Sequence, residues 1–177
     1  MPDRPDRLRA MLLGVAVGDA LGWPFEMPKR VLGQPSQEGA FHRWRRKAGS
    51  HFWSYEEVLP AGTYSDDTQL TLATGRALLH DDWFGHLVRK ELPSWRLYER
   101  GGGRTVLRSA DAWTRGFAPW TRAGSDSEKY FASGANGAAM RIAPHVSVGD
   151  NVLRRVIADA ITRAFQEILA ATVAHQE

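Results

Sequence analysis

Two adjacent carboxylates, those of Asp66 and Asp67, lie between the hydroxyl residues Ser65 and Thr68. Apolar residues recur at helical spacing from Leu70 onward, which predicts a helix that begins at Asp66 with Ser65 as its N-cap. Both carboxylates then project from the first helical turn, about 100° apart around the axis. A cluster of carboxylates and hydroxyls without His or Cys suits magnesium, calcium or manganese better than zinc.

The same run also has a purely structural interpretation. Acidic residues at a helix N-terminus complement the helix dipole, and a Ser at this position caps free backbone N–H groups. With Gln69 directly after it, however, the run places more oxygen-bearing side chains at one helix end than capping needs. This excess favours a metal site over capping alone.

Glu26 is the second candidate for chemistry. It follows Trp23, Pro24 and Phe25, just beyond a predicted helix over residues 7–22 that must end at or before the Pro. A carboxyl beside aromatic rings can lose part of its hydration, which raises its pKa and suits it to acid–base catalysis. A hydrated loop Glu is the simpler alternative.

A run of small residues is the third candidate. Its two glycines let the backbone bend tightly and approach a ligand, and its amide groups suit a pyrophosphate. A tight turn between helices explains the run equally well. The run consists of Ser133, Gly134, Ala135, Asn136, Gly137 and Ala138.

Helices are expected to position these candidates. Residues 28–60 show no clear periodicity and are predicted to form a long loop. Pro93 and the glycines at 101–103 are expected to separate two shorter helices. Apolar spacing predicts helices over residues 7–22, 82–91, 104–117 and 151–174, in addition to the one that begins at Asp66.

Two of these helices carry faces that need a partner. In the first, glycines recur at every fourth position after Ala10, at Gly14, Gly18 and Gly22. Since Gly costs about 1 kcal/mol inside a helix, we expect tight helix packing there, with close approach of a ligand as the alternative. The last helix, over 151–174, has a broad apolar face that self-association would cover.

Composition sets the limits on class and compartment. The chain has 177 residues, is 43% hydrophobic and carries a formal charge of +3, so we expect a single domain over residues 1–177. The one basic cluster, Arg43 to Lys47, is expected to be a solvated loop, and no nucleic acid is expected as a partner. The absence of Cys and of a signal peptide favours a cytoplasmic protein, with no membrane association expected.

Three motifs in this order resemble the ADP-ribosylglycohydrolase family, which includes the dinitrogenase-reductase-activating glycohydrolases. The resemblance covers nearly the whole chain, but only the N-terminal half or somewhat more of a typical member. The motifs are Gly18-Asp19-Ala20-Leu21-Gly22 followed by Glu26, then Ser65-Asp66-Asp67-Thr68, then Gly134-Ala135-Asn136-Gly137 with Met140-Arg141.

The resemblance implies an all-α fold and hydrolysis of the glycosidic bond that joins ADP-ribose to a protein side chain or a small acceptor. It implies a two-magnesium centre held in part by Ser65, Asp66 and Asp67, with Glu26 and Asp66 as catalytic residues. The loop at residues 133–138 would bind the diphosphate and ribose. ADP-ribose or an ADP-ribosylated protein is therefore the expected partner.

Two family features have no counterpart in the sequence. A second acidic cluster of the type Asp-x-Asp-Asp/Ser/Thr is not found between Asp150 and Glu177, and Thr162-Arg163 stands where Thr-His is usual. Without that cluster the magnesium centre lacks about half of its protein ligands. The alternative function is therefore that of a catalytically inactive, truncated family member that binds ADP-ribose or a partner chain.

Overall fold

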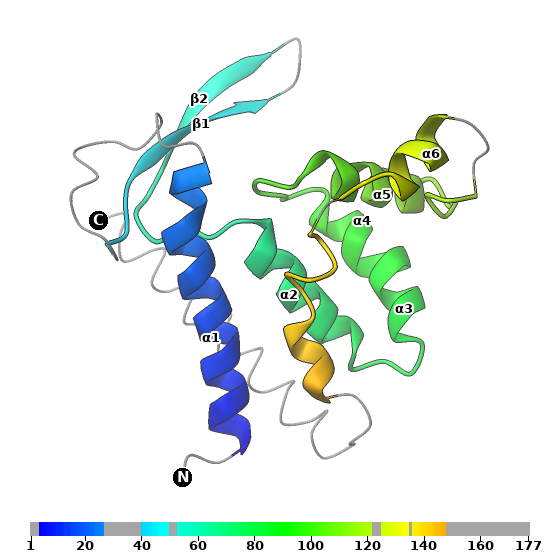
Figure 1. Cartoon of the computed structure of the whole chain (residues 1–177), viewed down its shortest axis with the longest axis horizontal. Helices are drawn as coiled ribbons and strands as arrows, with labels where there is room; N and C mark the ends of the chain where they lie inside the picture. Colours follow the sequence, from blue (N-terminus) through cyan, green and yellow to red (C-terminus); the bar gives the residue numbers. More distant parts are fainter. Residues whose placement is uncertain (1–3, 27–39, 50–52, 122–124, 135, 148–177) are drawn as a thin grey trace.

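A computed structural model of the chain describes residues 4–26, 40–49, 53–121, 125–134 and 136–147. The described part is mostly helical, with one small sheet of two strands, which confirms the predicted all-α class (Figure 1). Two predictions lie outside the described residues. They are the helix over 151–174, with its self-association, and the role of Ala135.

Short helical elements make up most of the described chain, and a hairpin follows the first of them. The elements before residue 80 are α1 (Arg4–Gly22), η1 (Trp23–Glu26), β1 (Trp44–Gly49), β2 (Ser54–Leu59) and α2 (Asp66–Ala77). Those after it are α3 (Trp83–His86), η3 (Leu87–Glu91), α4 (Leu92–Trp95), α5 (Arg104–Thr114), α6 (Ser125–Phe131) and η4 (Ala143–Ser147).

Helix α2 lies at the centre of the core. Its N-terminal neighbour α1 packs on it through Leu8 and Leu12, which contact Leu72. On its other side a larger cluster joins α2 to the helices from α3 to α5, around the fully buried Trp95. The buried members of that cluster are Leu70, Ala77, Leu87, Val88, Leu92, Trp95 and Ala110.

The glycines of α1 do not serve tight packing within the described part of the chain. A Cβ atom built on Gly14, Gly18 or Gly22 would meet no described atom within 4 Å. The described residues therefore do not provide the close helix contact that was predicted at these glycines. By length and hydropathy, the stretch Asp6–Glu26 could also cross a membrane, a test that core helices of soluble proteins pass as well. Its contacts with α2 identify it here as a packing helix.

The predicted loop over residues 28–60 contains a β-hairpin instead. Strands β1 and β2 pair antiparallel, with Trp44 opposite Leu59 and Arg46 opposite Glu57. Trp44 and Leu59 are buried against Trp23, whose ring lies 4.6 Å from that of Trp44 in an edge-to-face arrangement. This anchor fixes the hairpin at the C-terminal end of α1 (Figure 1).

The basic cluster predicted to be a solvated loop is part of strand β1. Arg46 Nε lies 2.6 Å from Glu57 Oε2 on the facing strand, and Arg45 contacts Glu56 at 3.5 Å. Cross-strand pairs of opposite charge stabilise a two-stranded sheet. The cluster therefore balances carboxylates of β2.

Pro93 does not end the helix that precedes it. The chain stays helical from Trp83 to Trp95 because η3 is a widened π-type turn, in which the Leu92 amide donates to the Leu87 carbonyl. Proline has no amide hydrogen and crowds the carbonyl four residues before it, and a widened turn relieves both problems. The predicted boundary at Pro93 is therefore wrong.

Candidate active site

The N-terminus of α2 forms as the sequence predicts. The helix begins at Asp66, and Ser65 is its N-cap, with the Ser65 Oγ accepting a hydrogen bond from the Asp67 amide at 3.3 Å. Ser65 and Asp66 are both buried. The acidic pair therefore sits at the positive end of the helix dipole, where negative charge is stabilised.

Asp19 of α1 holds this helix end from outside. Its Oδ2 atom accepts hydrogen bonds from the Ser65 amide (2.9 Å), the Thr68 amide (3.0 Å) and the Thr68 hydroxyl (2.6 Å). These bonds satisfy backbone donors that a helix start leaves free. Asp19 thus fixes the position of α1 relative to the acidic pair.

Four carboxylates from three elements gather at this end of α2. We call this cluster, composed of Asp19, Glu26, Asp66 and Asp67, the acidic corner. Glu26 lies close enough to Asp67 and Asp19 for their charges to raise its pKa. The structure therefore brings together Glu26, Ser65, Asp66 and Asp67, which the sequence predicted as one site.

Burial and mutual repulsion raise the pKa of three of these carboxyls. Burial, followed by the charge of Asp67, raises the pKa of Asp66 to about 7, and its neighbours Asp19 and Glu26 add to the shift. Burial and the charge of Asp19 raise the pKa of Asp67. Glu26 is an exposed residue, yet partial loss of hydration is the first cause of its raised pKa. No described basic residue is among the causes of these shifts, so the repulsion between the carboxylates is not offset by that part of the chain.

Gln69 does not belong to the acidic corner. Its Oε1 accepts hydrogen bonds from Trp95 Nε1 (2.9 Å) and the Arg100 amide (3.0 Å), and its Nε2 donates to the Tyr98 carbonyl at 3.1 Å. Gln69 therefore holds the segment after α4 against α2. The expectation that it adds an oxygen to the metal site is wrong.

The donor chemistry of the acidic corner fits a hard cation. Among the described residues, no three His, Cys, Asp or Glu side chains are arranged as ligands of a single ion. Magnesium, however, usually keeps several water ligands and uses only one or two carboxylates from the protein. Asp66 and Asp67 meet that need, whereas a zinc site with His or Cys ligands is not formed by these side chains.

The run 133–138, here called the Gly-rich loop, is described except for Ala135, and the turn that begins at Asn136 contacts α2. The amides of Ala139 and Met140 donate to the Asn136 carbonyl at 2.8 and 3.2 Å, which closes a tight turn. The Met140 carbonyl accepts a hydrogen bond of 3.1 Å from the hydroxyl of Thr71. Thr71 is four residues beyond Asp67, or about 6 Å along the helix axis.

A cavity borders the Gly-rich loop on the side of α5. Its volume is about 340 Å³, and its lining includes Ser133, Gly137, Ala138 and Arg141. No described atom lies within 4 Å of a Cβ built on Gly134 or Gly137, so packing does not require glycine at either position. The carboxylates of the acidic corner do not line this cavity.

The described part of the chain is mostly helical, with an acidic helix start and a tight turn packed on the same helix, and the comparison with known families identifies the class of protein. Residues 1–176 match the family described as ADP-ribosylglycohydrolase. This chain belongs to the ADP-ribosylglycohydrolase family. No curated protein and no solved structure matches the chain. Membership supports an activity of the ADP-ribosylglycohydrolase type and a partner that carries ADP-ribose.

Sequence reasoning missed the part that Asp19 plays. The residue was included in the first motif, but no function was assigned to it. An acidic residue at a predicted helix face, between glycines that leave the face open, was the available signal. Its partners are 46 and 49 residues away, so local spacing could not identify them.

Proposed function

We propose that this chain hydrolyses the glycosidic bond between ADP-ribose and a protein side chain or small acceptor, with magnesium bound at the acidic corner. The observation that carries the proposal is the meeting of Glu26, Asp66 and Asp67 at one helix end, where burial and, after it, charge repulsion raise the pKa of all three. Keeping several carboxylates close together costs electrostatic free energy. Such an arrangement is typical of a functional site that binds a cation.

The proposed ligands of magnesium are Ser65, Asp66 and Asp67. All three present hard oxygen atoms at the first turn of α2, and the Ser65 Oγ keeps a second lone pair beside its capping bond. When bound, the metal supplies positive charge that orients ribose hydroxyls and polarises water. The second ion expected from the resemblance has no proposed ligands among the described residues.

Glu26 is the proposed general base. It is exposed at the edge of the acidic corner, and its raised pKa strengthens it as a proton acceptor. In the proposed reaction Glu26 takes a proton from the attacking water, and the water oxygen bonds to the anomeric carbon as the bond from that carbon to the acceptor breaks. The departing acceptor atom keeps the electron pair of that bond and takes up the proton from Glu26. Asp66, which is buried, is proposed to act by holding the charge that orients the sugar.

The Gly-rich loop is the proposed site for the diphosphate and ribose. Its turn lies about one helical turn along α2 from Asp67, through the Thr71–Met140 hydrogen bond. The cavity beside it offers space next to Ser133, Gly137 and Ala138. Gly134 and Asn136 complete the proposed contacts among the described residues, and Ala135 remains part of the proposal from sequence.

Release of ADP-ribose from a modified protein or small acceptor tests this function. We expect release that depends on magnesium, and a loss of at least about 100-fold in Asp66→Asn, because the variant removes a charge needed in the transition state. Glu56→Gln, on the exposed hairpin, is the matched control and should keep full activity.

The alternative function gives a different result. If calorimetry shows ADP-ribose binding while no modified substrate is cleaved, the chain is a binding member of the family without catalysis. If wild type and Asp66→Asn release ADP-ribose at the same rate, the acidic corner is not the active site. Circular dichroism of each variant separates loss of activity from loss of folding.

A further inference from the structure

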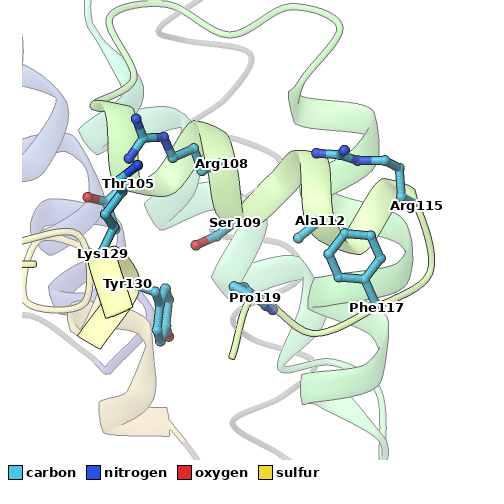
Figure 2. Close-up of a pocket in the computed structure, with 9 residues that line it drawn as sticks. All are labelled: Thr105, Arg108, Ser109, Ala112, Arg115, Phe117, Pro119, Lys129 and Tyr130. Atoms are coloured by element: carbon cyan, nitrogen blue, oxygen red, sulfur yellow. The ribbon is translucent and has the colours of Figure 1, made fainter. Parts of the chain in front are cut away.

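A smaller cavity lies between α5, the turn that follows it, and α6 (Figure 2). Its volume is about 220 Å³. Three basic side chains contribute to its lining, together with the hydroxyl residues Thr105 and Ser109. We call this cavity, with Arg108, Arg115 and Lys129, the basic pocket.

The spacing of the residues on α5 explains how the pocket forms. Arg108 and Ser109 lie three and four residues after Thr105, and Arg115, the C-cap of α5, lies seven residues after Arg108, so the four residues share one side of the helix. In Figure 2 the ends of Arg108 and Lys129 point to the same end of the pocket, and Arg115 lies at the other. The pocket therefore presents positive charge along its length.

This charge is not neutralised by the described residues that line the pocket, because none of them is acidic. Of the carboxylates close to these residues in sequence, Asp111 is paired with Arg96 at 2.8 Å, and Glu128, which precedes Lys129, does not line the pocket. Arg115 donates through Nε to the Asp111 backbone carbonyl and lies over the Phe117 ring at 5.5 Å. Among the described residues, the charge of Arg115 therefore has no anionic partner.

Other arginines of the chain show what is missing here. Arg76 pairs with Glu91 at 2.6 Å, and Arg46 pairs with Glu57 at the same distance. In the described part of the chain, Arg108 and Lys129 have no such partner. Three gathered cations with hydroxyl donors beside them form a site for an anion of more than one charge.

We propose that the basic pocket binds a phosphate or diphosphate group of a small ligand. Arg108 and Lys129 supply the charge at one end, and the Ser109 hydroxyl supplies a further donor. The volume is smaller than the roughly 300–1,000 Å³ typical of pockets that enclose a whole drug-sized ligand. The pocket therefore suits the phosphate end of a ligand, with Phe117 and Tyr130 in the lining to contact what is attached.

The basic pocket is separate from the acidic corner, and its function does not depend on hydrolysis. It adjoins the cavity beside the Gly-rich loop, since both include Thr105 and Ser109 in their linings. The Thr105 Oγ1 and Ser133 Oγ atoms lie 2.8 Å apart. A ligand in the basic pocket would therefore lie next to the Gly-rich loop and would not occupy the proposed metal site.

Calorimetry with pyrophosphate, at low ionic strength and without divalent cations, tests the proposal. We expect saturable binding that Arg108→Ala and Lys129→Ala each weaken by about tenfold or more, because each removes a charge-assisted hydrogen bond. Lys129→Arg should keep most of the affinity. Lys90→Ala, an exposed basic residue of η3 outside the pocket, is the matched control and should bind as wild type.

Inorganic phosphate and ADP, titrated in parallel, identify the source of the group. If phosphate and ADP bind with equal affinity, the pocket recognises only the phosphate group. If ADP binds more tightly and its binding still depends on Arg108, the pocket recognises a nucleotide. The proposal is overturned if pyrophosphate does not bind. It is also overturned if Asn136→Ala abolishes binding while Arg108→Ala has no effect, because the anion then occupies the Gly-rich loop.

Discussion

At the acidic corner, four carboxylates from α1, η1 and α2 meet at a buried helix end, whereas at the basic pocket three cations line a cavity of α5 and α6. The first cluster is tied to the backbone through Asp19, which accepts three hydrogen bonds from Ser65 and Thr68. The second is built from exposed side chains, with Arg108 and Lys129 on the surface.

The two clusters differ in how much water reaches their like charges. At the acidic corner burial, and after it repulsion from the neighbouring carboxylates, raises the pKa of Asp66 to about 7. At the basic pocket water can solvate each cation and weaken the repulsion. Substitutions in the acidic corner should therefore change the free energy of unfolding, and those in the basic pocket should change mainly the binding of anions.

The largest effect is expected for Asp19→Ala. The substitution leaves the Ser65 and Thr68 amides and the Thr68 hydroxyl without their acceptor, at a cost of about 3 kcal/mol in the free energy of unfolding. Urea denaturation measures it. Asp19→Asn keeps a carbonyl acceptor and should lose about half as much. A loss below about 1 kcal/mol in Asp19→Ala would contradict the role assigned to this residue.

A smaller effect is expected from pH. The pKa of Asp66 is about 7 in the folded chain and near 3.8 when unfolded, so the folded state holds the proton more tightly. Stability of the metal-free protein should therefore fall as pH rises from about 4 to 7, by about 2 kcal/mol after allowance for screening by water. Asp66→Asn should flatten this part of the profile, whereas Glu56→Gln on the hairpin should not.

Neutralising the neighbouring carboxylate should stabilise the metal-free chain. Asp67→Asn removes a charge that raises the pKa of both Asp66 and Glu26, and we expect a gain of about 0.5–1 kcal/mol at neutral pH. Thermal melts measure this gain. Added magnesium should stabilise wild type further and leave Asp67→Asn unchanged, because only the wild type keeps the proposed ligand. Destabilisation of the metal-free variant would show that repulsion does not govern this cluster.

The smallest effect is expected in the basic pocket. Lys129→Ala should change the free energy of unfolding by no more than about 0.5 kcal/mol, since an exposed side chain without an ion pair contributes little to stability. The same urea titration used for Asp19→Ala gives the comparison. A loss as large as that of Asp19→Ala would mean that the pocket is a structural feature of α6.

The start of α2 could be predicted because its signals are local. Ser65, Asp66 and the apolar residues after them lie within one stretch of sequence, and a helix cap depends only on such neighbours. The link from Asp19 to the same helix end could not be predicted in this way. It depends on the packing of α1 against α2.

The hairpin was missed because composition concealed its pattern. Gly, Pro and Arg made the stretch resemble a loop, and among the strand residues whose burial is described only Trp44 and Leu59 are buried. The useful signal was opposite charge, since Arg46 and Lys47 of β1 face Glu57 and Glu56 of β2. Pairing of the basic run with the acidic run that follows it in the sequence would have predicted strands there.

Direct measurement of magnesium binding by the metal-free protein tests the central claim, that the acidic corner is a cation site. Calorimetry should show saturable binding in wild type and in Glu56→Ala, and none in Asp66→Ala or Asp67→Ala. If both Asp variants bind magnesium as wild type does, or if folded wild type binds none at millimolar concentration, the carboxylates at the start of α2 do not hold the metal.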